Sequence, residues 1–257
     1  MTNDTASAAQ LPLLPDTTFV IKTFNRPHCL ARLLESLEQF GPVPTVIVDD
    51  GKPYADSQLT FGSHVKYIKT EFDIGLSAGR NTAIANLDTS RFILLDDDFV
   101  IGEQHPFTQE MYRAFEELDL DILTFGFARA KNMWYWARDF ICRADSLHLK
   151  WPRRPREHWV QPCDLGLNCF LGKTSKVDEV RWDRTLKVRE HWDFFLRMKF
   201  RRGKVACWMK PGDFVRQQNV ANTHEYRKYR GRSYFAARAR RKHGFKVVFD
   251  HVTNSRV

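Results

Sequence analysis

Short apolar runs alternate with amphipathic segments along the first hundred residues, and this pattern predicts strands and helices in turn. Thr18–Phe24 and Val43–Val48 are apolar runs of the length typical of buried strands. Between them, apolar residues recur at the spacing of one helix face: Cys29, Leu30, Leu33, Leu34 and Leu37. A strand, a helix and a second strand in this order indicate a parallel unit of an α/β fold.

Two further strands, at Val65–Ile68 and Phe92–Leu95, extend this predicted sheet, and a helix that begins after Gly75 joins them. Phe92–Leu95 is apolar at every position, which is typical of a strand buried on both faces. Later elements are predicted as a helix at Pro106–Leu118, a strand at Asp121–Phe127, strand-like sequence at Val160–Leu171 and a helix at His191–Phe200. In Lys131–Trp159 the tryptophans alternate with Arg and Pro, so we expect an irregular or helical insertion there.

These elements predict one α/β domain with a mostly parallel central sheet flanked by helices. The chain has 257 residues, enough for one large core, although two small domains are also compatible with this length. Residues 1–16 lack periodicity and predict a flexible lead-in. The domain is expected at residues 17–215, with two halves at 17–100 and 101–215. Residues 216–257 are expected to form a basic lid or tail.

The charge balance indicates which partners to expect. Forty Lys and Arg residues against 31 Asp and Glu give a net charge of +9, which favours anionic partners. Most of the excess lies between Arg216 and Lys246, where Glu225 is the one acidic residue. Three explanations are compatible with this segment: nucleic-acid binding, docking on an anionic membrane, or a solvated basic helix.

The cysteines and the N-terminus indicate a cytoplasmic protein. The five cysteines form no CxxC pair, which fits neither a disulfide framework nor a zinc ribbon. The first ten residues carry Asp4 rather than a basic cluster before an apolar run, so no secretory signal is predicted. No stretch approaches the ~20 apolar residues that span a bilayer. Any membrane contact is therefore expected to be peripheral, on the inner face of the membrane.

Acidic residues gather where the predicted strands end. Asp49 and Asp50 follow the second strand, and Asp96, Asp97 and Asp98 follow the fourth. In an open α/β sheet the ligand crevice lies outside the carboxyl ends of the strands, so the two groups should converge. Three adjacent carboxylates are costly to bury unless a cation neutralises them. The run therefore predicts either a Mg²⁺ or Mn²⁺ site that also binds phosphate, or a solvated acidic turn.

Two neighbouring segments bear on the kind of ligand. Asp49 and Asp50 can accept hydrogen bonds from ribose hydroxyls or a base NH group, or they can form a local turn with Gly51. Gly75–Asn81 combines small residues with a helix start, where the backbone can approach an anionic ligand. Arg80 can bind phosphate there or pair with the acidic run.

Candidate residues for acceptor chemistry lie further along the chain. Glu190 and Asp193 stand at the start of the helix His191–Phe200. A carboxylate there can act as general base on an acceptor hydroxyl, or it can simply favour the positive end of the helix dipole. Trp134 and Trp136 can stack on acceptor sugar rings or belong to the core.

Six segments, in order, resemble the inverting A-type (GT-A), family-2-like glycosyltransferases. The resemblance is narrower to the β1,4-N-acetylgalactosaminyltransferases that build gangliosides and to their bacterial relatives. The segments are Ile21–Arg26 (IKTFNR), Val48–Asp50 (VDD), Gly75–Asn81 (GLSAGRN), Leu95–Phe99 (LDDDF), Asn168–Lys176 (NCFLGKTSK) and His191–Leu196 (HWDFFL). The resemblance implies the GT-A fold and metal-dependent, inverting transfer of a hexose or N-acetylhexosamine from a UDP-sugar to a glycan or lipid-linked glycan.

The same resemblance implies a nucleotide-binding half at 17–100, an acceptor half at 101–215, and roles for individual residues. The donor-binding positions are Thr23, Asn25, Arg26, Asp49, Asp50, Gly75, Arg80, Asp96 and Asp97. The acceptor-binding positions are Trp134, Trp136, His191 and Trp192. Asp193 stands where the family places its catalytic carboxylate, and Glu190 lies beside it.

The metal, Mn²⁺ or Mg²⁺, would be held by Asp96, Asp98 and a late histidine. The sequence departs from the family here, because Asp213–Gln218 stands where that histidine is expected. His224 is the nearest candidate, and its alternative is a histidine of a surface loop.

Two other functional classes are compatible with the sequence. One is a nucleic-acid-binding protein that uses the basic C-terminal region, and the other is a module that binds sugar nucleotides without turnover. The first leaves Asp96–Asp98 unexplained, because carboxylates repel phosphate unless a metal intervenes. We therefore expect no nucleic-acid partner. Galactose, glucose, N-acetylglucosamine and N-acetylgalactosamine are all compatible donor sugars.

Overall fold

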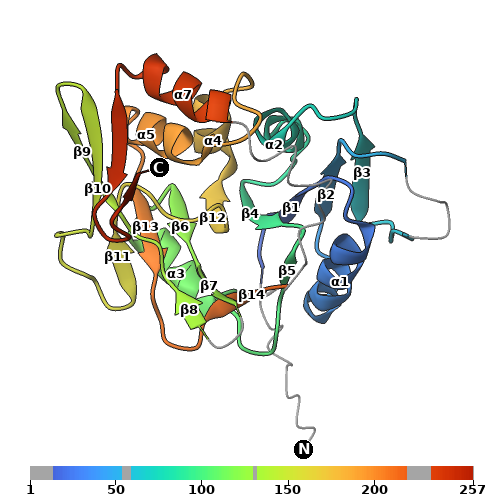
Figure 1. The fold of residues 1–257 in the computed structure, drawn as a ribbon. Helices are drawn as coiled ribbons and strands as arrows, with labels where there is room; N and C mark the ends of the chain where they lie inside the picture. Colours follow the sequence, from blue (N-terminus) through green and yellow to red (C-terminus); the bar gives the residue numbers. More distant parts are fainter. Residues whose placement is uncertain (1–13, 54–58, 130–131, 219–232, 257) are drawn as a thin grey trace, which may run out of the picture.

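A large mixed sheet forms the centre of the molecule, with helices on both sides (Figure 1). The structure is a computed structural model that describes residues 14–53, 59–129, 132–218 and 233–256. The strand order of the sheet is β11-β13-β6-β12-β4-β1-β2-β3. Its parallel half consists of β1 (Thr17–Thr23), β2 (Thr45–Asp49), β3 (Val65–Lys69) and β4 (Arg91–Asp96). This half matches the strands predicted from the apolar runs, and the α/β fold is confirmed.

The central strands are buried from both sides because successive side chains face opposite helix layers. Phe92 and Leu94 of β4 pack in a cluster with residues of α2, α4 and α5, whereas Ile93 and Leu95 pack with residues of α1 and α3. The helices are α1 (Pro27–Leu37), α2 (Leu76–Ile84), α3 (Gln109–Glu117), α4 (Thr174–Val180) and α5 (His191–Phe200), and the short 3-10 turn η1 (Glu38–Phe40) follows α1.

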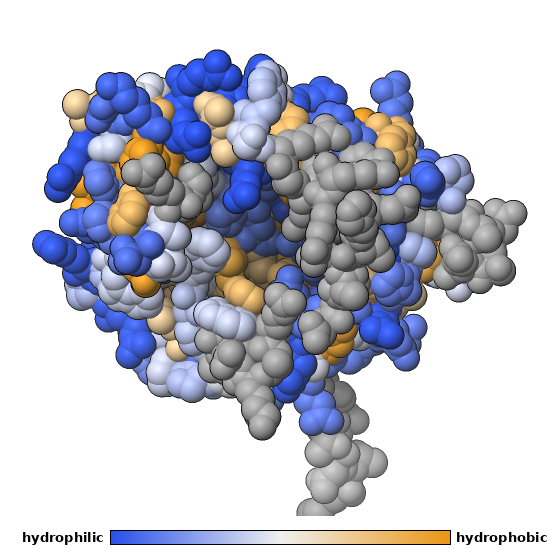
Figure 2. Space-filling model, in the orientation of Figure 1, coloured by the Kyte–Doolittle hydropathy of each residue, from blue (hydrophilic) through white to orange (hydrophobic). Residues whose placement is uncertain are grey.

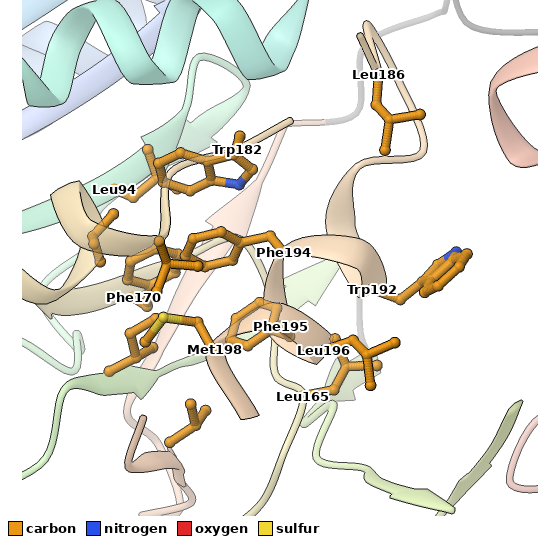
Figure 3. Packing of buried hydrophobic residues seen from close by; sticks show 14 of the residues in the cluster. Leu94, Leu165, Phe170, Trp182, Leu186, Trp192, Phe194, Phe195, Leu196 and Met198 are labelled. Atoms are coloured by element: carbon orange, nitrogen blue, oxygen red, sulfur yellow. The ribbon is translucent and has the colours of Figure 1, made fainter. Parts of the chain in front are cut away.

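Stacked aromatic rings fix the position of α5 on the sheet (Figure 3). The rings of Trp182 and Phe194 lie with centroids 4.3 Å apart and planes inclined by 13°. Phe170, on strand β12 (Phe170–Lys173), lies nearly parallel to Phe194 at 6.4 Å. Because these three side chains are at most 2% exposed, the first turn of α5 has a defined place beside the sheet.

The other half of the central sheet is mainly antiparallel. It comprises β12, β6 (Ile122–Thr124), β13 (Val205–Trp208) and β11 (Val160–Pro162). The single strand predicted at Asp121–Phe127 is divided at Phe125. Its second part, β7 (Gly126–Arg129), belongs to another sheet with β5 (Phe99–Val100), β14 (Phe214–Gln217) and β8 (Asn132–Trp134).

The insertion expected at Lys131–Trp159 contains β8 and a hairpin of β9 (Asp139–Arg143) and β10 (Ser146–Lys150), so the expectation of a helical segment is wrong. Residues 151–159 belong to no helix or named strand, as the irregular alternative predicts. Three of the ten residues of β9 and β10 are buried, which leaves little apolar pattern to recognise. The hairpin is extended by β15 (Val247–Asp250) and β16 (Ser255–Arg256).

Residues beyond 215, where we expected a lid or tail, thus contribute to the fold. Helix α7 (Ser233–Lys242) places Phe235 and Ala239 in the same apolar cluster as α5. All five cysteines are free thiols, and four are buried. Within the described ranges, no helix combines the length and the apolar character needed to cross a membrane.

Gly166 provides a test of the packing of the segment between β11 and β12 against β6. A β-carbon at Gly166 would lie 2.6 Å from Cβ of Thr124, which is fully buried. We expect Gly166→Ala to lower the free energy of unfolding by about 1–3 kcal/mol, measured by urea titration. Gly102→Ala is the matched control, because its nearest contact would be 3.4 Å from Arg216. It should change the free energy by less than about 0.5 kcal/mol, and equal losses in both variants would contradict this packing.

Candidate active site

The parallel strands bring the two acidic groups to one edge of the sheet. The register places Thr23, at the end of β1, beside Asp49 on one side. On the other side, Lys22 lies beside Asp96. The ends of β1, β2 and β4 therefore meet where the sequence predicts a ligand crevice.

Asp97, the middle residue of the acidic run, is an internal anchor. Its side chain is fully buried and accepts hydrogen bonds from Thr23 Oγ1 at 2.8 Å and from Arg26 Nε at 3.2 Å. Arg26 also forms an ion pair with it. Burial raises the pKa of Asp97 to about 6, while the charge of Arg26 opposes this rise. The expected donor-binding residues Thr23, Arg26 and Asp97 thus hold the end of β1 against the end of β4.

Asp96 and Asp98 are the carboxylates of the run that remain partly exposed. Their side chains are 30% and 14% exposed. Asp98 lies 3.1 Å from Arg26 Nη1 and accepts a hydrogen bond from Gln217 Nε2 at 3.3 Å. Asp96 lies 3.1 Å from Arg80 Nη2. Within the acidic run, Asp96 and Asp98 are therefore the side chains that a ligand can reach.

Asp49 and Asp50 lie inside the framework. Asp50 forms an ion pair with Lys22 and accepts a hydrogen bond from the Gly75 backbone N–H at 2.8 Å. Asp49 accepts hydrogen bonds from Tyr67 Oη at 2.6 Å and from a backbone N–H at 2.7 Å. Both are at most 1% exposed. A direct contact of Asp50 with a uridine, as the resemblance implies, would require the pair with Lys22 to open.

Arg80 connects the acidic run to the start of α5. Its guanidinium group is 1% exposed. Nη1 lies 2.5 Å from Glu190 Oε1, and Nη2 contacts Asp96. Asn168 also donates to Glu190 Oε1, at 3.3 Å. One buried arginine therefore sets the distance between the ends of two acidic segments from different halves of the chain.

Asp193 has a different environment from Glu190. It is fully buried between α5 and α7, where Oδ1 lies 2.7 Å from His243 Nε2 and 2.8 Å from Lys242 Nζ. Oδ2 lies 3.1 Å from Arg197 Nε. Burial by itself would raise the pKa of Asp193, but these hydrogen bonds and charges outweigh it and hold the pKa below its usual value. Asp193 joins two helices, whereas Glu190 lines a cavity.

This cavity has a volume of about 500 Å³ and lies on the face that is hollowed in Figure 2. Its polar lining residues are Arg80, Asp96, Asn168, Glu190, Arg189, His191 and Gln217. Its apolar wall includes Phe127, Trp136, Leu149 and Leu165. The cavity thus offers charged groups at one side and an apolar surface at the other, as small-molecule sites do.

The structure separates the expected acceptor-binding residues. Trp136, His191 and Trp192 line the cavity. Trp134 is not among its lining residues and instead stacks on Phe127 at 5.1 Å. Burial lowers the pKa of His191 to about 4, so its imidazole is neutral at neutral pH.

Four lining residues carry a buried polar atom that lacks a hydrogen-bond partner within the described ranges. These atoms are Arg80 Nε, Trp136 Nε1, Asn168 Oδ1 and His191 Nε2. An unsatisfied buried polar group is unfavourable, and a polar ligand or water can remove the penalty. The cavity is therefore suited to a ligand rich in hydrogen-bonding groups.

The remaining predicted positions are partly structural. Asn25 adopts a left-handed backbone conformation with φ of 55°, and its Oδ1 accepts a hydrogen bond from Lys52 N–H at 2.7 Å. Gly75 has φ of 90°, and a β-carbon there would lie 2.7 Å from the Lys187 backbone. His224 lies outside the described residues. Among those described, no group of three or more His, Cys, Asp or Glu is arranged to hold a metal ion.

Sequence reasoning missed Lys22, Asn168 and Gln217. Lys22 leaves a signal, because a lone lysine in an apolar strand requires a buried partner. Asn168 and Gln217 leave none, because nothing in their flanking sequence shows that they approach Glu190 and Asp98.

Comparison with known proteins bears on this site. Residues 18–180 match the model of the family described as Glycosyl transferase family 2. Beta-1,4 N-acetylgalactosaminyltransferase 2 of Mus musculus is 28% identical over 183 residues, which cover 70% of this chain and 35% of that protein. Beta-1,4 N-acetylgalactosaminyltransferase 1 of Homo sapiens is 29% identical over 200 residues, covering 73% and 37%. The chain thus matches little more than a third of the length of these relatives.

Solved structures share the fold at low sequence identity. Crystal structures of S. aureus TarS 1–349 superpose with a TM-score of 0.55 at 14% identity, covering 79% of this chain and 60% of that one. The same fragment in complex with UDP-GlcNAc gives 0.57 at 12% identity, covering 83% and 64%. The sheet with its flanking helices is the GT-A arrangement, and the family model covers more than half of the sequence. The chain belongs to glycosyl transferase family 2 and has the GT-A fold.

Proposed function

We propose that this glycosyltransferase moves a hexose or N-acetylhexosamine from a UDP-sugar to a hydroxyl of a glycan or lipid-linked glycan, with inversion. The observation that carries the proposal is the bridge from Asp96 through Arg80 to Glu190 at the wall of the cavity. Crystals of TarS with UDP and with UDP-GlcNAc support a UDP-sugar donor. The names of the relatives in mouse and human support an aminosugar.

Glu190 is the general base in this proposal. The acceptor hydroxyl donates a hydrogen bond to its carboxylate and loses the proton as its oxygen attacks the anomeric carbon. The bond from that carbon to the diphosphate breaks on the opposite face, so the configuration inverts. Arg80 orients the carboxylate through the 2.5 Å contact. The geometry favours Glu190 over Asp193, because Arg197, Lys242 and His243 already contact the Asp193 carboxylate away from the cavity.

Mn²⁺ or Mg²⁺ is the proposed cofactor, held by Asp96 and Asp98. The fit is adequate, because Mg²⁺ is usually bound through one or two carboxylates together with water and substrate phosphates. Both side chains are partly exposed at the edge where β4 ends. When bound, the ion would stabilise the negative charge that develops on the leaving diphosphate. Arg26 orients the carboxylate of Asp98, and Arg80 orients that of Asp96, through their ion pairs.

The acceptor is proposed to bind along the wall formed by Trp136, His191 and Trp192. Peripheral contact with an anionic membrane is proposed for α7, where Arg241 is exposed and Tyr234 is 55% exposed. This contact would bring a lipid-linked acceptor close to the enzyme.

Glu190→Gln tests the base. The amide cannot take the proton, so we expect kcat to fall on the order of 10²- to 10⁴-fold while the dissociation constant for UDP stays within about twofold. Transfer from a panel of UDP-sugars and calorimetric titration with UDP provide the two measurements. Unchanged kcat in Glu190→Gln would remove Glu190 from the mechanism.

Asp193→Asn tests whether Asp193, the other candidate for the general base, has a structural role instead. The loss of its charged contacts with α7 should lower the free energy of unfolding by about 1–3 kcal/mol while kcat falls less than tenfold. The folded pKa lies below the ordinary value of 3.8. The stabilisation by Asp193 is therefore present above about pH 4 and lost as pH falls through the folded pKa. A loss of kcat as large as in Glu190→Gln, with unchanged stability, would instead identify Asp193 as the base.

Asp98→Ala tests the metal. We expect Mn²⁺ to tighten UDP binding by the parent chain and to have no such effect on the variant, as measured by calorimetry with and without EDTA. Asp145→Ala is the control, because Asp145 is 57% exposed and lies at the turn between β9 and β10. If EDTA leaves transfer by the parent chain unchanged, the proposed cofactor is wrong.

A further inference from the structure

A second hollow, which we call the hairpin pocket, lies on the β9–β10 hairpin. Its volume is about 390 Å³. The residues that define it here are Asp139, Lys150, Trp151, Arg153, Arg154, Asp164 and Lys199. It belongs to the segment in which tryptophans alternate with Arg and Pro, and the proposed transfer reaction does not use it.

The charges of the hairpin pocket are only partly compensated. Arg154 pairs with Asp139 and lies 3.0 Å from Asp164 Oδ1, and Lys199 lies 2.5 Å from Asp164 Oδ2. Lys150 and Arg153 take part in no ion pair within the described ranges. Four cations against two carboxylates leave an excess of two positive charges. The pocket therefore favours an anionic ligand.

Trp151 adds an apolar surface to the charged lining of the hairpin pocket. It is 45% exposed, which is uncommon for a tryptophan. Pro152, which follows it, is buried, and a second proline comes after Arg154. Because each proline fixes its own backbone angle φ, the backbone of this segment has fewer accessible conformations. Such preorganisation lowers the entropic cost of binding.

The hairpin pocket and the cavity lie on opposite sides of the same strand. Leu149 lines the cavity, whereas the next residue, Lys150, lines the hairpin pocket. In the same way, Leu165 lines the cavity and the preceding residue, Asp164, lines the hairpin pocket. Successive residues of a strand point to opposite faces. Strand β9 is at the edge of its sheet, and its residues Phe140 and Ile141 also line the hairpin pocket.

We propose that the hairpin pocket binds an acidic glycan, as an extension of the acceptor outside the cavity. The inference rests on the proposed transfer to a glycan. Lys150 and Arg153 would bind carboxylate or phosphate groups, the face of Trp151 would cover a sugar ring, and Asp139 and Asp164 would accept hydrogen bonds from hydroxyls. An anionic membrane fits less well, because the surface is concave whereas a bilayer is flat.

Direct binding to the full chain tests the proposal without any transfer reaction. Oligogalacturonate is titrated by calorimetry, with maltohexaose as the neutral oligosaccharide and poly-glutamate as the polyanion without sugar. We expect oligogalacturonate to bind most tightly and its affinity to fall with added salt. Trp151→Ala and Arg153→Ala should each weaken it on the order of tenfold, as the loss of one charge-assisted contact does.

Matched controls are Phe72→Ala and Arg113→Ala, which change an exposed aromatic and an exposed arginine outside the hairpin pocket. Both should bind oligogalacturonate as the parent chain does. Urea titration checks the folding of each variant, and Arg153→Glu replaces Trp151→Ala if the latter unfolds.

Three results would overturn the proposal. Binding that is unchanged in Trp151→Ala and Arg153→Ala places the glycan elsewhere. Equal affinity for poly-glutamate shows attraction by charge alone. Binding to vesicles of phosphatidylcholine and phosphatidylglycerol, lost in these variants while oligogalacturonate does not bind, identifies a lipid site instead. UDP titration of the same samples reports on the proposed transferase independently, so either idea can fail without the other.

Discussion

The position of Arg80 is the constraint on which the candidate site depends. A buried guanidinium group is costly unless carboxylates surround it, and here Glu190 and Asp96 do so at 2.5 and 3.1 Å. The guanidinium carbon lies over the Trp182 ring, 5.7 Å from its centroid. The cation therefore cannot move without losing its contact with Trp182 and its ion pairs with Glu190 and Asp96. In this way the packing of the core determines the separation of two acidic groups at the cavity.

The same principle divides the acidic residues at the ends of the strands into two groups. Asp50 and Asp97 are buried with Lys22 and Arg26 as partners, and together they tie β1 to its neighbours. Asp96 and Asp98 keep part of their surface exposed. A carboxylate paired with a buried cation holds the strand ends in place. A partly exposed carboxylate can still exchange its partner for a ligand. Burial therefore distinguishes the two roles where residue type does not.

This distinction also explains how far the sequence could be used. Strands β1, β2 and β4 were predictable because burial on both faces requires continuous apolar runs. The β9–β10 hairpin was not, because only alternate positions of short strands are buried there. Glu190 and Asp193 stand on the same helix start and have the same chemistry. Their different surroundings depend on Lys242 and His243, which approach from the far end of the chain.

The contact of α7 with Asp193 also changes the meaning of the positive net charge. Lys242 and His243 contact Asp193, and Lys242 also lies 2.7 Å from Asp183 Oδ2. Part of the basic C-terminal sequence thus stabilises the fold and is not available to bind phosphates. A protein that bound nucleic acid through this region would have to do so with the cations that remain. The charge of Lys242 is explained by its contact with Asp193, which links α7 to α5, whereas Arg241 stays exposed for the proposed membrane contact.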